Sequence, residues 1–100
     1  MNNKEYWYDP RHTGCLRIVD YDNMVIHGSD PKEPYWCVDF KKINGGKGLE
    51  VHFDNKDTHH GNNVLKTYYE DRNMTLHWSD GNKWRRLKHN PLILVEAMKN

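Results

Sequence analysis

Apolar and polar residues alternate along most of the chain, and the alternation is clearest in its second half. Residues 74–78 place apolar side chains at every second position, as a strand with one buried face requires. The turn at 79–82 contains Asp-Gly, a pair that suits a type I′ hairpin because Gly81 accepts a positive φ at low cost. The pattern therefore predicts a hairpin closed by Trp78 and Trp84, with at least one indole in the core.

The same alternation predicts strands along the rest of the chain, after an extended aromatic segment at 6–12. Segments rich in Gly, Pro, Asn and Asp separate them, so that residues 28–34 are expected to form a polar loop and 44–48 a flexible turn. Residues 55–63 form another long irregular stretch. The strands are expected at 15–20, 24–27, 35–42, 49–54 and 64–69, with Arg17 and Val19 on one face of the first, Trp36, Val38 and Phe40 on one face of the third, and Leu49, Val51 and Phe53 on one face of the fourth.

Seven or eight short strands joined by tight turns leave no room for crossover helices. The sequence thus predicts one all-β domain over residues 1–100, an antiparallel meander curled into a small up-and-down barrel or roll. Residues 86–100 form a C-terminal tail in which Pro91 suits the first turn of a short helix. The following Leu-Ile-Leu-Val run is equally typical of a buried strand, and we favour the strand.

The composition excludes several classes of protein. The net charge is +1, which gives no general attraction to nucleic acid or to anionic membranes. No apolar run approaches the roughly 20 residues that span a bilayer, and residues 1–7 do not resemble a secretory signal. We therefore expect a cytoplasmic or nuclear protein without a membrane partner, and we expect Cys15 and Cys37 to be buried thiols rather than a disulfide.

Several short motifs recur together in a known set of proteins. The chain carries WYDPRHTGCLRI at 7–18, HG at 27–28 followed by YWCV at 35–38, THHG at 58–61 and LHWSDGNKW at 76–84. In these motifs it resembles small uncharacterised proteins encoded by algae and by large DNA viruses of algae and amoebae. The resemblance extends to Trp84 but not into the tail. It implies a β-rich fold and, for a virus-encoded protein, a place in the virion, and it carries over no catalytic residue.

Polar residues near the start of the chain are candidates for a ligand pocket. Asp9, Arg11 and His12 would form a hydrogen-bonded set with Asp80 if a barrel brought the first and the penultimate hairpins together. The alternative that we favour is an Arg–Asp pair that closes one end of the barrel. The complete pocket candidate is Asp9, Arg11, His12, His59, His60, Trp78 and Asp80.

The histidines do not predict a metal site. His59 and His60 are adjacent, and on an extended backbone adjacent side chains point to opposite faces. No pair of ligands has the usual zinc spacing, and we predict no metal, no cofactor and no catalytic residue. The four tryptophans could line a ligand mouth, but in so small a barrel side chains are expected to fill the interior instead.

Two surface roles remain. A basic edge is a candidate for nucleic-acid binding, although a solvated edge strand explains the same residues: Lys83, Trp84, Arg85, Arg86 and Lys88. Exposed aromatic and apolar residues at the two ends are candidates for contact with a protein partner or a second copy: Tyr6, Trp7, Tyr8, Leu92, Ile93 and Leu94. The sequence analysis favours the second role, a non-enzymatic interaction or assembly module that serves as a structural or accessory protein. Nucleic-acid binding is the first alternative, and a small hydrolase or metal-binding protein that uses the histidines is the second.

Overall fold

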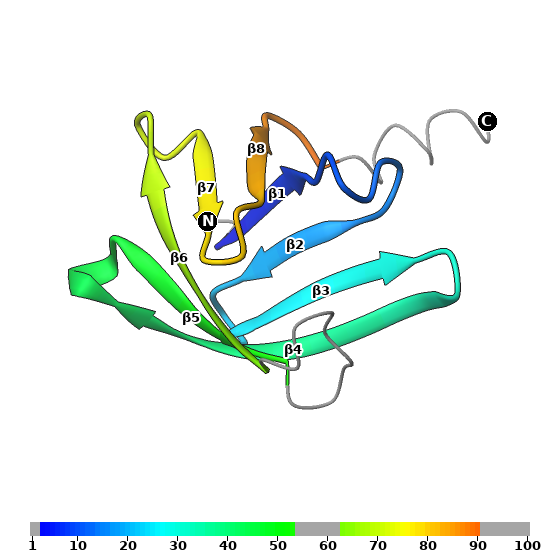
Figure 1. Cartoon of the computed structure of the whole chain (residues 1–100), viewed down its shortest axis with the longest axis horizontal. Coiled ribbons are helices and arrows are strands. Elements are labelled where there is room, and N and C mark those ends of the chain that lie inside the picture. Colours follow the sequence, from blue (N-terminus) through cyan, green and yellow to red (C-terminus); the bar gives the residue numbers. More distant parts are fainter. Residues whose placement is uncertain (1–2, 54–62, 91–100) are drawn as a thin grey trace.

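The computed structural model describes residues 3–53 and 63–90, and these fold into a closed antiparallel barrel of eight strands (Figure 1). Each strand pairs with its neighbours in chain order, and β1 pairs with β8 to close the barrel. The predicted all-β up-and-down barrel is confirmed. The elements are β1 Lys4–Tyr8, β2 Arg17–Asp20, β3 Val25–Asp30, β4 Glu33–Ile43, the 3-10 turn η1 Asn44–Gly46, β5 Gly48–His52, β6 Val64–Glu70, β7 Thr75–Trp78 and β8 Lys83–Leu87.

The alternation in the sequence sets the inside and the outside of the barrel. Every second side chain of the central strands is buried, while its neighbours face solvent. The predicted inward faces of β4 and β5 are confirmed, and both Trp78 and Trp84 belong to the core. The buried apolar side chains are those of Trp7, Val19, Ile26, Trp36, Val38, Phe40, Leu49, Val51, Phe53, Leu76, Trp78 and Trp84.

Residues 28–34 do not form the polar loop that the sequence predicted. Strand β3 continues to Asp30 and β4 begins at Glu33, so the two strands are joined by a tight turn and make a long hairpin (Figure 1). The cause is packing across the hairpin. Gly28 lies opposite Trp36, and a Cβ atom at Gly28 would sit only 2.1 Å from the indole Cζ2, so only glycine leaves room for this ring. Trp36 Nε1 then donates a hydrogen bond of 2.9 Å to Asp30 Oδ2.

Two further local predictions need correction. The aromatic segment near the N-terminus is itself a strand, β1, which pairs with both β2 and β8. The turn between β7 and β8 is not type I′, because Gly81 alone among its residues has a positive φ, of 93°. Gly81 N donates to the carbonyl of Trp78 at 3.0 Å and Trp78 N donates to the carbonyl of Asn82 at 2.9 Å, which is typical of a type I turn followed by a glycine bulge.

Some predictions fall on parts of the chain that lie outside the described residues. They are the irregular stretch with His59 and His60 and the tail with Leu92, Ile93 and Leu94. Cys15 and Cys37 form no disulfide, as predicted, but both are only half-buried and not buried. Within the described ranges, no helix combines the length and the apolar character that a membrane crossing needs.

Candidate functional site

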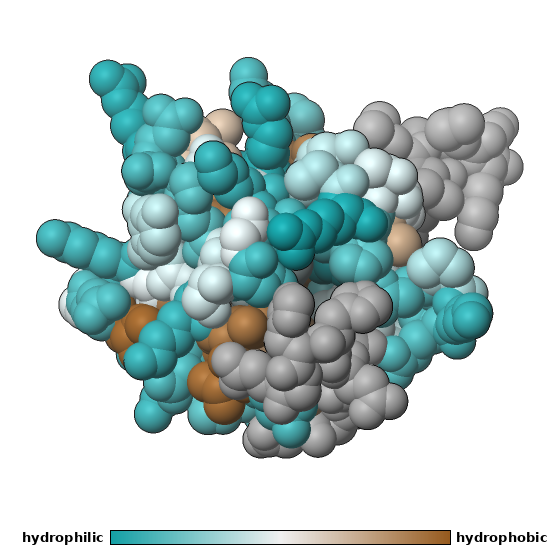
Figure 2. Space-filling model, in the orientation of Figure 1, coloured by the Kyte–Doolittle hydropathy of each residue, from teal (hydrophilic) through white to brown (hydrophobic). Residues whose placement is uncertain are grey.

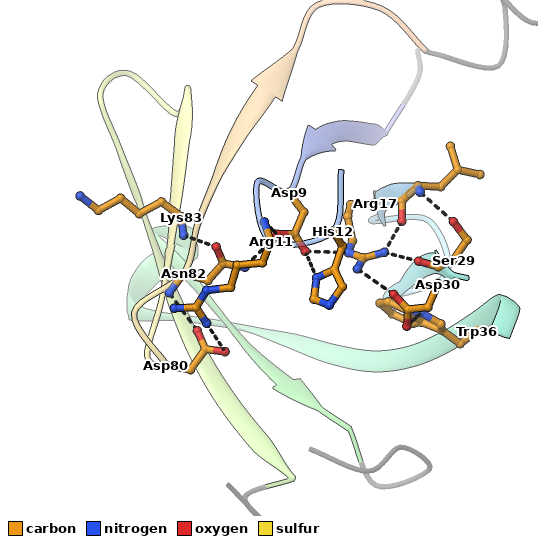
Figure 3. Close-up of polar contacts among 11 residues, drawn as sticks. Asp9, Arg11, His12, Arg17, Ser29, Asp30, Trp36, Asp80, Asn82 and Lys83 are labelled. Atoms are coloured by element: carbon orange, nitrogen blue, oxygen red, sulfur yellow. Dashed lines mark hydrogen bonds and ion pairs between the residues drawn. The ribbon is translucent and has the colours of Figure 1, made fainter. Parts of the chain in front are cut away.

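A buried carboxylate organises one end of the barrel (Figure 3). Asp9, which is 2% exposed, lies just after β1 and accepts hydrogen bonds from four donors. Arg11 N and Asn82 Nδ2 bind Oδ1 at 2.9 and 3.0 Å, while His12 Nδ1 and Arg17 Nε bind Oδ2 at 2.9 and 3.2 Å. These donors come from the β1–β2 loop, from β2 and from the β7–β8 turn, so one side chain ties three segments together.

The hydrogen bonds also set the charge of this carboxylate. Burial raises the pKa of Asp9, but the hydrogen bonds from Asn82, His12 and Arg11 N, together with the charge of Arg17, outweigh it and lower the pKa below its ordinary value. Asp9 is therefore an anion at neutral pH.

Arg17 is the buried cation of the same cluster. Its side chain is 3% exposed, and besides Asp9 it binds Asp30 Oδ1 at 3.2 Å and the carbonyls of Leu16 and Ser29 at 2.8 and 2.7 Å. The guanidinium also lies over the ring of Trp36, 5.1 Å from its centroid. The cluster thus extends from β1 to the distal part of the β3–β4 hairpin, as Figure 3 shows.

The structure brings together four residues of the predicted pocket set. Asp9 binds His12, and Arg11 Nη1 lies 3.7 Å from Asp80 Oδ2, as expected if the barrel joined the first and the penultimate hairpins. Trp78, another member of the predicted set, lies in the core instead, where its ring packs on Trp84. The favoured alternative is also confirmed, because the Arg11–Asp80 pair bridges the two loops at this end of the barrel. Since the Asp9 oxygens are occupied by donors from the protein, the arrangement fits a structural clasp better than a ligand site.

Arg17, Asn82 and Asp30 are the members of the cluster that the sequence analysis missed. A usable signal was present for Arg17, because it shares its face of β2 with Val19 and a charged side chain on an apolar face needs a buried partner. Asn82 carried no such signal, since Asn is common in turns for local reasons.

The interior of the barrel is filled, as the sequence analysis favoured. The four tryptophans are between 2% and 6% exposed. Trp78 packs on Trp84 with ring centroids 4.5 Å apart, and Phe53 contacts both Trp36 and Trp78. Trp78 Nε1 is buried and has no hydrogen-bond partner within residues 3–53 and 63–90.

A partly buried carboxylate, that of Glu5, lies among aromatic side chains elsewhere in the barrel. Glu5 Oε1 accepts a hydrogen bond of 2.7 Å from the Tyr69 hydroxyl and one of 3.3 Å from Trp7 Nε1, and Tyr69 also bonds to Tyr21. Burial raises the pKa of Tyr21 to about 12 and raises that of Tyr69 as well, so both phenols stay neutral. Arg86 lies 3.6 Å from Glu5 Oε2, and its guanidinium is over the Trp7 ring.

The outer surface of β1, β6, β7 and β8 carries exposed aromatic and basic side chains. In one cross-strand row, Tyr68 of β6 lies opposite His77 of β7, and His77 lies opposite Lys83 of β8. In the adjacent row, Arg85 of β8 lies between Thr75 of β7 and Tyr8 of β1. Tyr68 is 52% and Tyr8 38% exposed. We call this surface the basic–aromatic wall and define it as Tyr8, Lys66, Tyr68, His77, Lys83 and Arg85.

An open groove of about 650 Å³ runs over this wall. Its volume lies within the roughly 300–1,000 Å³ of small-molecule sites. Acidic residues line one part of it, but Glu70 forms an ion pair with His77. The lining residues are Pro10, Glu70, Asp71, Thr75, His77, Lys83 and Arg85.

The predicted basic edge is only partly correct. Lys83, Arg85 and Lys88 are exposed, but Trp84 is a core residue because the alternation of β8 turns it inward. Arg86 also points inward, to Glu5 and Trp7. The continuous stretch of basic residues in the sequence is therefore two separate sets in space.

The predicted contact surface also loses a member. Trp7 is 2% exposed and packs against Tyr69, with their ring centroids 6.0 Å apart. It therefore cannot contact a partner. Tyr6 is half-buried and Tyr8 is exposed. On the face of the molecule seen in Figure 2, most residues are hydrophilic and hydrophobic residues show only in small areas. Among the described residues visible on that face there is no large apolar patch of the kind that a permanent interface uses.

The part of the chain that the structure describes contains no group of three or more His, Cys, Asp or Glu residues placed to hold a metal ion. No family model, no curated protein and no solved structure matches the chain. The resemblance to algal and viral proteins therefore stays a prediction from its motifs, and the function has to be argued from the surface itself.

Proposed function

We propose that the protein is a binding module for single-stranded nucleic acid, which it contacts on the basic–aromatic wall. The observation that carries this proposal is the cross-strand arrangement of β6, β7 and β8. It places the exposed ring of Tyr68 beside His77 and Lys83, with Arg85 and Tyr8 in the adjacent row. Exposed aromatic rings beside cations are the elements that single-strand binders use.

Tyr68 supplies a surface for a base. Its ring lies parallel to that of His77, with an interplanar angle of 2° and a centroid distance of 4.6 Å. One face of the phenol is therefore covered by the imidazole. Because half of the side chain is exposed, the other face is open to a base, which would continue the stack.

Lys83, Arg85 and Lys66 supply the phosphate contacts. All three are exposed and point outward, because each alternates with a buried residue of its strand. Glu70, on the same surface, contacts His77 Nε2 through its carboxylate. The strands β6–β8 thus present three outward cations against the carboxylates of Glu70 and of Asp71, which follows β6 and lines the same groove, a local excess of positive charge that the net charge of +1 hides.

The assembly reading has less support, since Trp7 is buried and Leu92, Ile93 and Leu94 lie outside the described residues. A hydrolase that uses His12 is disfavoured because Asp9 and His12 belong to the clasp that joins the loops.

The test is fluorescence anisotropy with a labelled oligothymidine of about twelve nucleotides, within the roughly 4–16 nucleotides that small barrels bind. The wild type is compared with Lys83→Gln/Arg85→Gln and with Tyr68→Ala. The matched control is Lys32→Gln/Lys42→Gln, which removes the same charge from exposed positions of the β3–β4 hairpin, away from the wall.

We expect saturable binding that both wall variants weaken and the control does not. A duplex of the same length should bind more weakly, because its bases are not free to stack. Equal weakening by the wall and control variants would mean that binding depends only on the net charge of the protein. The absence of binding at low salt would refute the proposal. Light scattering on the same samples shows whether the chain self-associates instead.

A further inference from the structure

A chain of polar side chains crosses the outer surface of β2, β3 and β4, away from the basic–aromatic wall. Asp20 Oδ2 lies 3.1 Å from His27 Nε2, and His27 Nδ1 lies 2.9 Å from the Tyr35 hydroxyl. Asp20 is 1% exposed and Tyr35 is 61% exposed. A buried carboxylate therefore orients an imidazole whose other nitrogen meets an accessible hydroxyl.

The protonation states follow from the hydrogen bonds. The side-chain hydrogen bond from Asn23 and that from His27 lower the pKa of Asp20 to about 2 against the opposing effect of burial. Asp20 is an anion at neutral pH and can only accept, so the His27 proton sits on Nε2. Whenever His27 is neutral, its Nδ1 lone pair accepts the hydrogen bond of the Tyr35 hydroxyl.

Two further side chains lie beside the series formed by Asp20, His27 and Tyr35. Lys4 lies opposite Asp20 on β1, and Cys37 lies opposite His27 on β4. A hydrogen bond with Cys37 raises the pKa of Tyr35, so the phenol keeps its proton at neutral pH and needs a base to lose it.

We propose that Tyr35 is a nucleophile that accepts an acyl group from an activated ester, with His27 as its base and Asp20 as the residue that positions His27. The relation of the three groups is that of a nucleophile, a base and a third group that orients the base. The nucleophile stands on the open surface, so the site takes small esters with a good leaving group.

p-Nitrophenyl acetate is an ester of this kind. The Tyr35 oxygen forms a bond to the acetyl carbon while the phenolic proton moves to His27 Nδ1. The carbon–oxygen bond of the ester breaks, and its electron pair leaves with p-nitrophenolate. The products are O-acetyl-Tyr35 and p-nitrophenolate, and His27 then releases its proton to solvent.

The chain contains its own comparison residue. Tyr68 is nearly as exposed as Tyr35 and also lies beside a histidine, but its ring is stacked flat on His77, whose Nε2 pairs with Glu70. Exposure and the presence of a nearby histidine are thus matched, and the hydrogen bond from the hydroxyl to an oriented imidazole is the difference.

The experiment treats the full chain with p-nitrophenyl acetate at neutral pH and follows the acetylation of each tyrosine by mass spectrometry of its peptides. We expect Tyr35 to react at least about tenfold faster than Tyr68, since general-base assistance contributes roughly 10²–10⁴-fold. His27→Gln keeps a polar side chain of similar size without the base and should bring the two rates together. Asp20→Asn should do so in part.

Circular dichroism is used to check that each variant is folded. Equal rates at Tyr35 and Tyr68 in the wild type would overturn the proposal, and this comparison needs no variant. A His27→Gln protein that keeps the fast Tyr35, or an acetyl group found on Cys37 in place of Tyr35, would overturn it as well.

Discussion

Replacing Arg17 with Met tests whether the buried clasp holds the barrel together. Met fills much of the same space but donates no hydrogen bond. The change leaves two carboxylates, Asp9 and Asp30, without their cation and removes the Arg17 donor from the carbonyls of Leu16 and Ser29, of which Leu16 keeps the bond from Ser29 N. Breaking a buried ion pair from one side costs about 3–5 kcal/mol, which is a large share of the roughly 5–15 kcal/mol that stabilises a domain of this size.

The assay is thermal unfolding followed by tryptophan fluorescence, which reports on the cluster because Trp36 lies against the guanidinium. At about 4–8 °C per kcal/mol, the melting temperature should fall by roughly 12–40 °C. Arg17→Lys keeps the charge without the planar fork of donors, so its stability should lie between those of the wild type and Arg17→Met.

The matched control is Arg11→Met. Arg11 is half exposed and its distance to Asp80 is 3.7 Å, so its loss should cost no more than about 1 kcal/mol. If Arg17→Met were as stable as Arg11→Met, the clasp would not contribute to the fold, and the Asp9 cluster would have to be reconsidered as a ligand site.

Three other predictions concern the hairpin, acid stability and the wall. Gly28→Ala should lower the free energy of unfolding by about 1–3 kcal/mol because the new Cβ meets Trp36. In a double-mutant cycle, Trp36→Val should remove most of that cost, and additive effects would contradict the packing argument. Asp20 has a pKa lowered to about 2, so its stabilisation is present above the unfolded value near 3.8 and is lost as the pH falls through 2. Asp20→Asn should therefore flatten the dependence of the unfolding free energy on pH between about 4 and 2, and an unchanged slope would show that the carboxylate gains nothing from folding. For the wall, the slope of log affinity against log salt should be about −2 for three phosphate contacts to a single strand. Lys83→Gln/Arg85→Gln should bring this slope to roughly −0.7. A slope that stays near about −2 in the variant would place the phosphate contacts elsewhere.

The fold could be predicted from the sequence because period-two alternation specifies which side of each strand is buried. Leu49 and Val51 show why this works, since both are buried while Glu50 and His52, which alternate with them, are only half-buried. The alternation does not report where pairing ends. The hairpin at 28–34 was missed because its pairing depends on a specific contact between Gly28 and Trp36, and such a contact leaves no periodic signal.

The candidate site was predictable only in part for a related reason. Asp9, Arg11, His12 and Asp80 could be grouped as polar residues in loops that a closed barrel brings together, and the structure confirms the grouping. The basic edge was misjudged because a run of charged letters was read as one surface. In a strand, consecutive residues face opposite sides, so Arg85 and Arg86 have different partners and different roles.

The composition explains why charged clusters lie inside so small a barrel. Only 36% of the residues are apolar, and four tryptophans supply much of the core. Large flat rings leave gaps of irregular shape and carry N–H groups that need partners, and Asp30 and Glu5 both accept such a bond. Each carboxylate then needs a cation, which Arg17 and Arg86 provide while also covering an indole ring. Buried ion pairs of this kind add little net stability compared with apolar packing, but a wrong register would leave their charges unpaired. The clasp therefore fixes the closure between β1 and β8, and that closure is what sets Tyr8 beside Arg85 on the outer wall.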